Sequence, residues 1–175
     1  MASDAPASSP PPRDWRASLR IYLSPPSLRM LALGFAAGLP LLLVLGTLSF
    51  RLREAGIDRS TIGYFSWVGL AYGFKWVWAP LVDRVPLPGL TRWLGRRRAW
   101  LLLAQAGVMA GLIGLAAADP RVSLGPMVGW ALAVAFASAT QDIALDAYRI
   151  ESAPTEQQPA LAASYQTGYR LAMIW

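Results

Sequence analysis

Long uncharged apolar runs constrain this chain more than any other feature of its sequence. A helix needs about 20 apolar residues to cross the hydrocarbon core of a bilayer, and the run from Met30 to Phe50 reaches that length without a charge. Unpaired backbone groups are too costly in lipid, so each such run has to be helical. The hydrophobicity is continuous along each run and does not alternate, which argues against a transmembrane β-barrel. The sequence therefore predicts an all-α membrane protein.

The runs predict five membrane spans joined by short connections, so that neighbouring helices run antiparallel. The second run is broken only by Lys75, and the fourth is uncharged until Asp142. The expected spans cover residues 30–50, 60–82, 99–118, 124–148 and 159–175.

Two further expectations concern the parts of the chain outside complete spans. We expect residues 1–27 to form a disordered, Pro-rich cytoplasmic tail. The fifth run reaches the last residue without a polar cap. We therefore expect residues 28–175 to be part of a larger bundle, truncated in the fifth helix, with at least one more span and a second half missing.

Composition narrows the chemistry that the chain can perform. Charged residues make up 15% of it, against about 25% in soluble domains, which again indicates a membrane protein. The chain has no cysteine and no histidine, which excludes disulfides, thiol catalysis and thiolate or imidazole metal sites. Its net charge of +6 does not indicate nucleic-acid binding, because the basic residues lie between the apolar runs. We expect no nucleic-acid partner, no cofactor and no metal.

The distribution of basic residues predicts the orientation, because short cytoplasmic loops carry an excess of Lys and Arg. One side of the predicted bundle holds Arg13, Arg16, Arg20, Arg29, Arg84, Arg92, Arg96, Arg97, Arg98 and Arg149. The other side holds Arg51, Arg53, Arg59 and Arg121. The N-terminus is therefore expected in the cytoplasm.

A charged motif lies between the second and third predicted spans. Asp83 and Arg84 end the second run, and Gly95, Arg96 and Arg97 begin the third. This connection resembles the G-x-L-x-D-R-x-G-R-R motif of major facilitator transporters, with an insertion between its two halves. A carboxylate at a helix end can pair with an arginine across the loop and hold one face closed. We predict a gating latch; a basic cluster that only sets topology is the alternative.

Two carboxylates near the end of the fourth span are four residues apart and share a helix face. With Arg149 as the boundary, Asp142 lies about 10 Å inside the membrane and Asp146 about 5 Å. A carboxylate at mid-span costs about 2.5–3.5 kcal/mol, and such groups usually mark an ion or proton path. We predict a functional role for Asp142 and a structural or latch role for Asp146.

Two cations share the inner half of the membrane with Asp142. Lys75 lies about 14 Å along the second span from Arg84, and Arg170 about 16 Å into the fifth run. An unpaired buried charge is costly, so at least one ion pair with Asp142 is expected. The pair is either purely structural or part of a mechanism. In a mechanism, a cation binds an anionic substrate group, or protonation of Asp142 breaks the pair and permits movement.

The first predicted span contains small residues and a proline. Gly34 and Gly38 have the small-xxx-small spacing that permits close helix contact. Pro40 is expected to kink the helix. Close packing is the favoured interpretation, and helix bending during transport is the alternative.

Taken together, several segments resemble the muropeptide permease (AmpG-type) family of the major facilitator superfamily, which has eukaryotic acetyl-CoA transporters as relatives. The resemblance extends from residue 28 to the end of the chain. The segments that carry it are residues 34–40, 61–65, 72–84, 95–101 and 141–147.

The resemblance implies proton-coupled import of anhydro-muropeptides across the bacterial inner membrane, for cell-wall recycling linked to β-lactamase induction and β-lactam resistance. It implies a multi-pass permease and not an enzyme. By the same resemblance, Gln141 and Asp142 line the central cavity, and Tyr72, Lys75 and Arg170 belong to the substrate or proton pathway.

Three alternatives stay open. The same fold could carry another cargo, such as acetyl-CoA or a peptide. A membrane enzyme could hold a divalent metal between Asp142 and Asp146 for phosphoryl transfer. The chain could also be a membrane partner that transports nothing.

Overall fold

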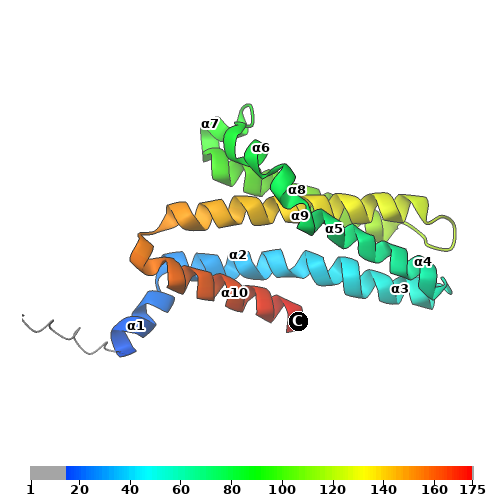
Figure 1. Cartoon of the computed structure of the whole chain (residues 1–175), viewed down its shortest axis with the longest axis horizontal. Helices are drawn as coiled ribbons and strands as arrows, with labels where there is room; N and C mark the ends of the chain where they lie inside the picture. Colours follow the sequence, from blue (N-terminus) through cyan, green and yellow to red (C-terminus); the bar gives the residue numbers. More distant parts are fainter. Residues whose placement is uncertain (1–14, 175) are drawn as a thin grey trace, which may run out of the picture.

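The computed structural model describes residues 15–174, which form helices and contain no strand (Figure 1). A short helix is followed by a long helical stretch, a series of short helices, two long helices and a final one. In chain order the elements are α1 (Trp15–Tyr22), α2 (Pro25–Leu42), a π-helix (Leu43–Thr47), α3 (Leu48–Glu54), α4 (Arg59–Phe65), a 3₁₀-helix (Ser66–Gly69), α5 (Leu70–Gly73), a 3₁₀-helix (Lys75–Val77), α6 (Ala79–Arg84), α7 (Leu90–Leu94), α8 (Arg96–Ala117), α9 (Gly125–Ser152), a 3₁₀-helix (Thr155–Gln157) and α10 (Gln158–Ile174).

Three helical stretches within residues 15–174 are long and apolar enough to cross a membrane. They are Pro25–Glu54, Arg96–Ala117 and Gly125–Ser152. These stretches overlap the first, third and fourth predicted spans, and the prediction of an all-α membrane protein is confirmed. The second predicted span is a series of short helices, and α10 in the fifth has 17 residues. Membrane crossing by these two segments stays a prediction.

The predicted disordered tail extends too far along the chain. The structure has α1 within it and begins α2 at Pro25. The hydroxyl of Ser24 donates to the carbonyl of Ile21 at 2.6 Å, and that of Ser27 donates to the same oxygen at 2.7 Å. These bonds satisfy the end of α1, and proline is favoured in the first turn of a helix. Residues 1–14 of the predicted tail lie outside the described part of the chain.

Pro40 does not end the first membrane helix. It has no backbone N–H to offer to the preceding turn. The N–H of Leu43 donates to the carbonyls of both Leu39 and Pro40, and the chain continues through the π-helix into α3. The disturbance expected at Pro40 is thus followed by a π-helical segment in an otherwise continuous helix.

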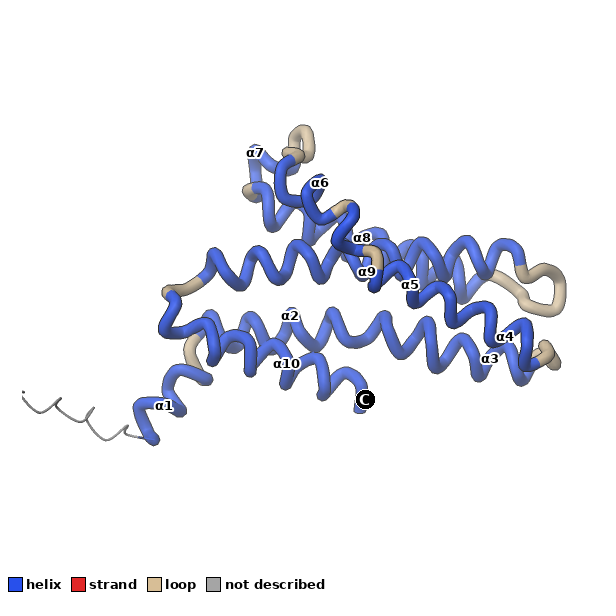
Figure 2. Tube along the Cα trace, in the orientation of Figure 1, coloured by secondary structure: helices blue, strands red, loops and turns tan. Residues whose placement is uncertain are grey.

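Helices α2 and α10 lie side by side with their backbones in contact (Figures 1 and 2). A Cβ on Gly34 would overlap the carbonyl oxygen of Tyr165, and one on Gly168 would overlap that of Leu31. A Cβ on Gly38 would lie 2.7 Å from the carbonyl oxygen of Tyr169. The close contact predicted for Gly34 and Gly38 is therefore confirmed, with α10 as the partner.

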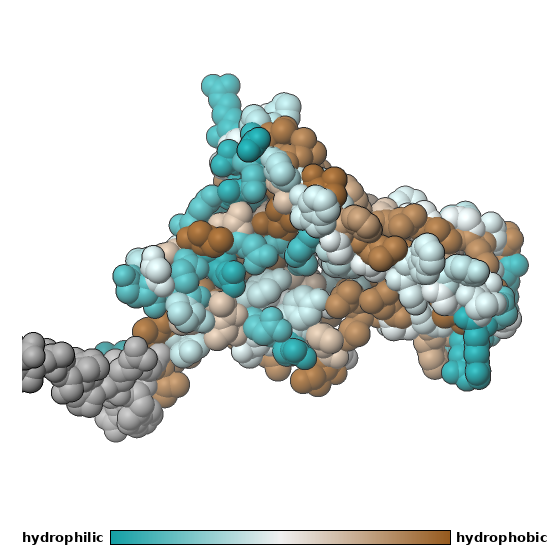
Figure 3. Space-filling model, in the orientation of Figure 1, coloured by the Kyte–Doolittle hydropathy of each residue, from teal (hydrophilic) through white to brown (hydrophobic). Residues whose placement is uncertain are grey.

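Helix α9 is the central element, since it contacts α2, α5, α6, α8 and α10. At the end of the bundle away from α1, an apolar core joins the π-helix and α3, α4 and the 3₁₀-helix after it, α8 and α9. It contains the buried side chains of Val44, Leu48, Leu52, Phe65, Val68, Val108, Leu115, Met127, Ala131, Val134 and Ala135. On the face drawn in Figure 3, apolar residues dominate this half, whereas polar residues gather toward α6, α7 and the end of α9.

Arg51 closes the far end of this core. Its guanidinium donates to the carbonyls of Leu115 at 2.6 Å, Ala116 at 3.3 Å and Ala118 at 2.7 Å. These carbonyls end α8, where a cation is favoured by the helix dipole and unpaired oxygens need donors. Arg51 therefore ties α3 to α8, a role that charge counting along the sequence did not indicate.

Candidate functional site

The central polar site lies where three segments meet beside α9. It consists of Asp142 and the residues around it, namely Tyr72, Lys75, Gln141 and Tyr165. The carboxylate of Asp142 is 17% exposed, and its Oδ2 lies 3.9 Å from Nζ of Lys75. The hydroxyl of Tyr165 donates to Oδ1 at 3.5 Å. Asp142 therefore connects α9 to the segment after α5 and to α10, and the expected ion pair is present with Lys75.

Lys75 lies at the interruption of the second predicted span, which Figure 2 shows between α5 and α6. It begins a 3₁₀-helix, and Trp78 follows directly after that helix. The indole N–H of Trp78 donates to Oγ1 of Thr140 at 3.1 Å, and its ring stacks on Phe136 with centroids 4.4 Å apart. These two contacts attach the interrupted segment to α9, and Thr140 directly precedes Gln141.

Two polar groups of the central polar site are buried without a protein partner in the described part of the chain. Gln141 is 2% exposed, and its Nε2 donates no hydrogen bond within residues 15–174. The hydroxyl of Tyr72 is likewise buried and unpaired there. Buried polar groups are nearly always satisfied. An amide and a phenol with free capacity are therefore well suited to bind a polar ligand.

Arg170 does not join the central polar site. It is exposed on α10 and lines a shallow cavity with Gln166 and Thr167. No ion pair with Asp142 is present among residues 15–174 for Arg170. Gly168 faces α2, and two residues further along a helix is a rotation of roughly 200°. The packing of α10 thus turns Arg170 away from the contact.

Two residues of the predicted charged connection, Asp83 and Arg97, form an ion-pair cluster with Glu151 of α9, here called the latch cluster. Arg97 is 16% exposed and donates to Oδ1 of Asp83 at 2.6 Å and to Oε1 of Glu151 at 2.9 Å. The cluster therefore joins the ends of α6, α8 and α9. Gly95, at φ 79°, precedes α8 and permits the turn that aims Arg97 at both carboxylates.

The other residues predicted for the latch lie differently. Asp146 pairs with Arg149 on its own helix at 3.5 Å and not with Arg97. Arg84 is exposed and forms no ion pair within the described range, and Arg96 lines a cavity at this end. Glu151 was not predicted, although an acidic residue at the end of α9 opposite a basic cluster could have indicated it.

Comparison with known protein families covers part of the central polar site and part of the latch cluster. A family model described as Acetyl-coenzyme A transporter 1 matches residues 28–123, more than half of the chain. The chain belongs to the acetyl-coenzyme A transporter 1 family. The range of this chain that the family model matches includes Tyr72, Lys75, Asp83 and Arg97.

Two further relatives of the chain carry the names of transport proteins. The chain is 44% identical over 156 residues to anhydromuropeptide permease of Escherichia coli (strain K12), covering 89% of this chain and 31% of that protein. It is 39% identical over 142 residues to a protein of Rickettsia felis that carries the transporter name AmpG 4, covering 81% of this chain and 34% of that protein. The predicted AmpG-type relationship is confirmed, and the chain is a multi-pass membrane protein.

The chain spans about a third of the length of these two relatives. No solved structure matches it.

Proposed function

We propose that the full-length protein is a proton-coupled importer of anhydro-muropeptides in the bacterial inner membrane. The observation that carries this proposal is the 44% identity to a protein named anhydromuropeptide permease over 89% of the chain. The central polar site supports it, because it brings a carboxylate, a cation and two unpaired polar groups together beside α9.

The proposed coupling step takes place at Asp142. The ionised carboxylate forms an ion pair with Lys75 and accepts a hydrogen bond from the hydroxyl of Tyr165. When a proton neutralises Asp142, the attraction to Lys75 is lost, and the ammonium group becomes available for a carboxylate of the cargo. A buried charge is costly without a partner. Protonation and cargo binding are therefore favourable together.

The two unpaired polar groups supply cargo contacts in this scheme. The amide of Gln141 can donate to and accept from peptide or sugar groups, and the hydroxyl of Tyr72 can do the same. Hydrogen bonds from these two groups to the cargo offset part of the cost of breaking the ion pair between Asp142 and Lys75.

The latch cluster is proposed to hold the cytoplasmic end of the bundle closed. It joins α6, α8 and α9 through Arg97, so a movement of α6 relative to α8 and α9 has to break one or both bonds. The excess of arginine at this end supports a cytoplasmic position for it and for the N-terminus. We also propose that the protein has the five expected spans and the major facilitator architecture.

Acetyl-CoA is the second candidate cargo, and the name of the matching family model favours it. Its phosphates could bind Lys75 in the same way as a carboxylate. A metal-dependent phosphotransferase is not favoured, because Asp142 pairs with Lys75 and Asp146 pairs with Arg149.

The cargo is tested by uptake of labelled anhydro-muropeptide into cells that lack their own permease and express the full-length protein. Uptake that a protonophore abolishes and that unlabelled acetyl-CoA does not inhibit is expected. Inhibition by acetyl-CoA at similar concentrations would move the proposal to the second cargo. Absence of uptake, with the protein present in the membrane, would contradict the muropeptide proposal.

A further inference from the structure

Two adjoining cavities lie between α2, α8 and α9 at the end that carries the latch cluster. The first has a volume of about 460 Å³ and is lined by polar groups, including Arg96, Arg97, Glu151 and Ser152. The second, of about 440 Å³, is a largely apolar groove along α2 and α8. The residues that line both cavities, and so form the junction between them, are Arg29, Leu94, Arg98 and Tyr148.

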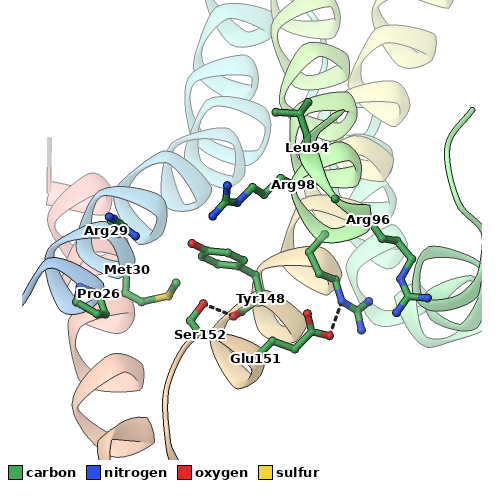
Figure 4. Close-up of a pocket in the computed structure, with 11 residues that line it drawn as sticks. Pro26, Arg29, Met30, Leu94, Arg96, Arg98, Tyr148, Glu151 and Ser152 are labelled. Carbon is green, nitrogen blue, oxygen red and sulfur yellow. Dashed lines mark hydrogen bonds and ion pairs between the residues drawn. The ribbon is translucent and has the colours of Figure 1, made fainter. Parts of the chain in front are cut away.

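The junction concentrates positive charge. In Figure 4 the guanidinium groups of Arg29 from α2 and Arg98 from α8 approach each other, with the hydroxyl of Tyr148 from α9 directed between them. Both arginines are exposed, and neither forms an ion pair within residues 15–174. Glu151 is the acidic residue that lines these cavities, and it is bound to Arg97. The junction therefore carries two uncompensated cations and one phenolic donor.

The apolar groove continues from this junction along α2 and α8, which both belong to candidate membrane-spanning stretches. Its floor and walls include Ala32, Leu33, Leu101 and Leu102, with Leu101 buried and Leu102 49% exposed. These side chains follow Arg29 and Arg98 by about one helical turn, or roughly 5 Å along each helix. The site is thus amphiphilic: charged at the membrane surface and apolar directly below it.

We propose that this junction binds one anionic glycerophospholipid. The phosphate lies between Arg29 and Arg98 and accepts a hydrogen bond from Tyr148, and the first part of an acyl chain lies in the groove between α2 and α8. Guanidinium groups suit phosphate geometrically, and basic pockets between membrane helices are suited to anionic headgroups. The inference goes beyond the proposed transport function and does not depend on the cargo.

The test is native mass spectrometry of the full-length protein in mild detergent, titrated with phosphatidylglycerol and, separately, with phosphatidylcholine. One phosphatidylglycerol is expected to bind to each protein, and it is expected to do so at lower lipid concentrations than phosphatidylcholine requires. The double variant Arg29→Gln, Arg98→Gln is expected to bind it about thirtyfold more weakly, from about 1 kcal/mol for each basic residue.

A matched control separates a built site from general attraction to anionic lipid. The double variant Arg20→Gln, Arg92→Gln removes the same charge from exposed positions near the same end that line neither cavity. It is expected to bind as the unaltered protein does. Equal loss in both double variants would overturn the proposal in favour of diffuse electrostatic attraction.

The apolar part of the proposal has its own test. Leu102→Trp keeps every charge and fills the groove, and it is expected to weaken phosphatidylglycerol binding as well. Competition with inorganic phosphate distinguishes a lipid site from a simple anion site. Displacement of the lipid by millimolar phosphate, or full binding by Leu102→Trp, would overturn the proposal. Tyr148→Phe provides a second headgroup variant if the double arginine variant fails to fold.

Discussion

Nζ of Lys75 lies 3.9 Å from Oδ2 of Asp142, and this pair joins the interrupted second predicted span to α9. The distance is at the outer limit of an ion pair, and Lys75 is 37% exposed, so the pair is neither tight nor fully buried. A pair of this kind can be opened without a large energetic cost, which is what a coupling step requires.

The first prediction concerns the charge balance of this pair. Lys75→Gln leaves the partly buried carboxylate of Asp142 without its cation and is expected to lower the free energy of unfolding by about 1–2 kcal/mol, below the range for fully buried pairs because Lys75 is partly exposed. Thermal unfolding of the purified protein in detergent measures it. The double variant Lys75→Gln, Asp142→Asn is expected to recover most of the loss. Equal destabilisation in the single and double variants would contradict a direct interaction.

The second prediction tests the backbone contact between α2 and α10. Gly34→Ala places a methyl group on the carbonyl of Tyr165 and is expected to cost about 1–3 kcal/mol through overpacking. Gly129→Ala in α9 is the control, since a Cβ there meets no atom within 4 Å. The melting temperature of each variant in detergent is the measurement. If the two variants have the same melting temperature, α10 does not pack against α2 as described.

The third prediction addresses the latch cluster. Arg97→Gln removes both ion pairs and is expected to open the cytoplasmic end, raising the maleimide labelling rate of a single cysteine introduced at Ser152 about tenfold, for a loss of about 1.4 kcal/mol. The chain has no cysteine, so an introduced cysteine is the one labelled site within these 175 residues. Arg84→Gln, which removes an exposed charge without an ion pair in the described structure, is the control. Unchanged labelling in Arg97→Gln would argue that the cluster closes nothing.

The fourth prediction concerns Arg51, which donates to the end of α8. Arg51→Gln is expected to destabilise the protein by about 1–2 kcal/mol, because carbonyls at a helix end lose their donors and a favourable charge. Amide hydrogen exchange should increase in the last turn of α8. Arg53→Gln, two residues away and exposed, is expected to leave this exchange unchanged. Equal exchange in both variants would show that the cap contributes little.

Much of the fold follows from hydropathy, but the second segment shows the limit of that argument. Uncharged runs of sufficient length predicted the first, third and fourth membrane helices, because lipid leaves a long apolar run few options besides a helix. Hydropathy contains no information on whether a segment is one helix or several. At the interruption, Trp78 contacts Thr140 and Phe136 of α9, and hydropathy cannot reveal such tertiary contacts.

The candidate site divides in the same way. The cost of a buried charge predicted that Asp142 would have a cationic partner. The choice of Lys75 over Arg170 depends on the rotation of α10, which Gly168 sets by its contact with Leu31. Tyr165 could not be predicted either, since it reaches Asp142 only because α10 packs closely on α2.

The most direct test of the account is accumulation of labelled anhydro-muropeptide by cells expressing the variant Asp142→Asn at normal membrane abundance. The account predicts that the variant still exchanges cargo down its gradient but no longer accumulates it, because asparagine cannot take up and release the coupling proton. Accumulation at the level of the unaltered protein, still sensitive to a protonophore, would contradict the role of Asp142 as the coupling carboxylate.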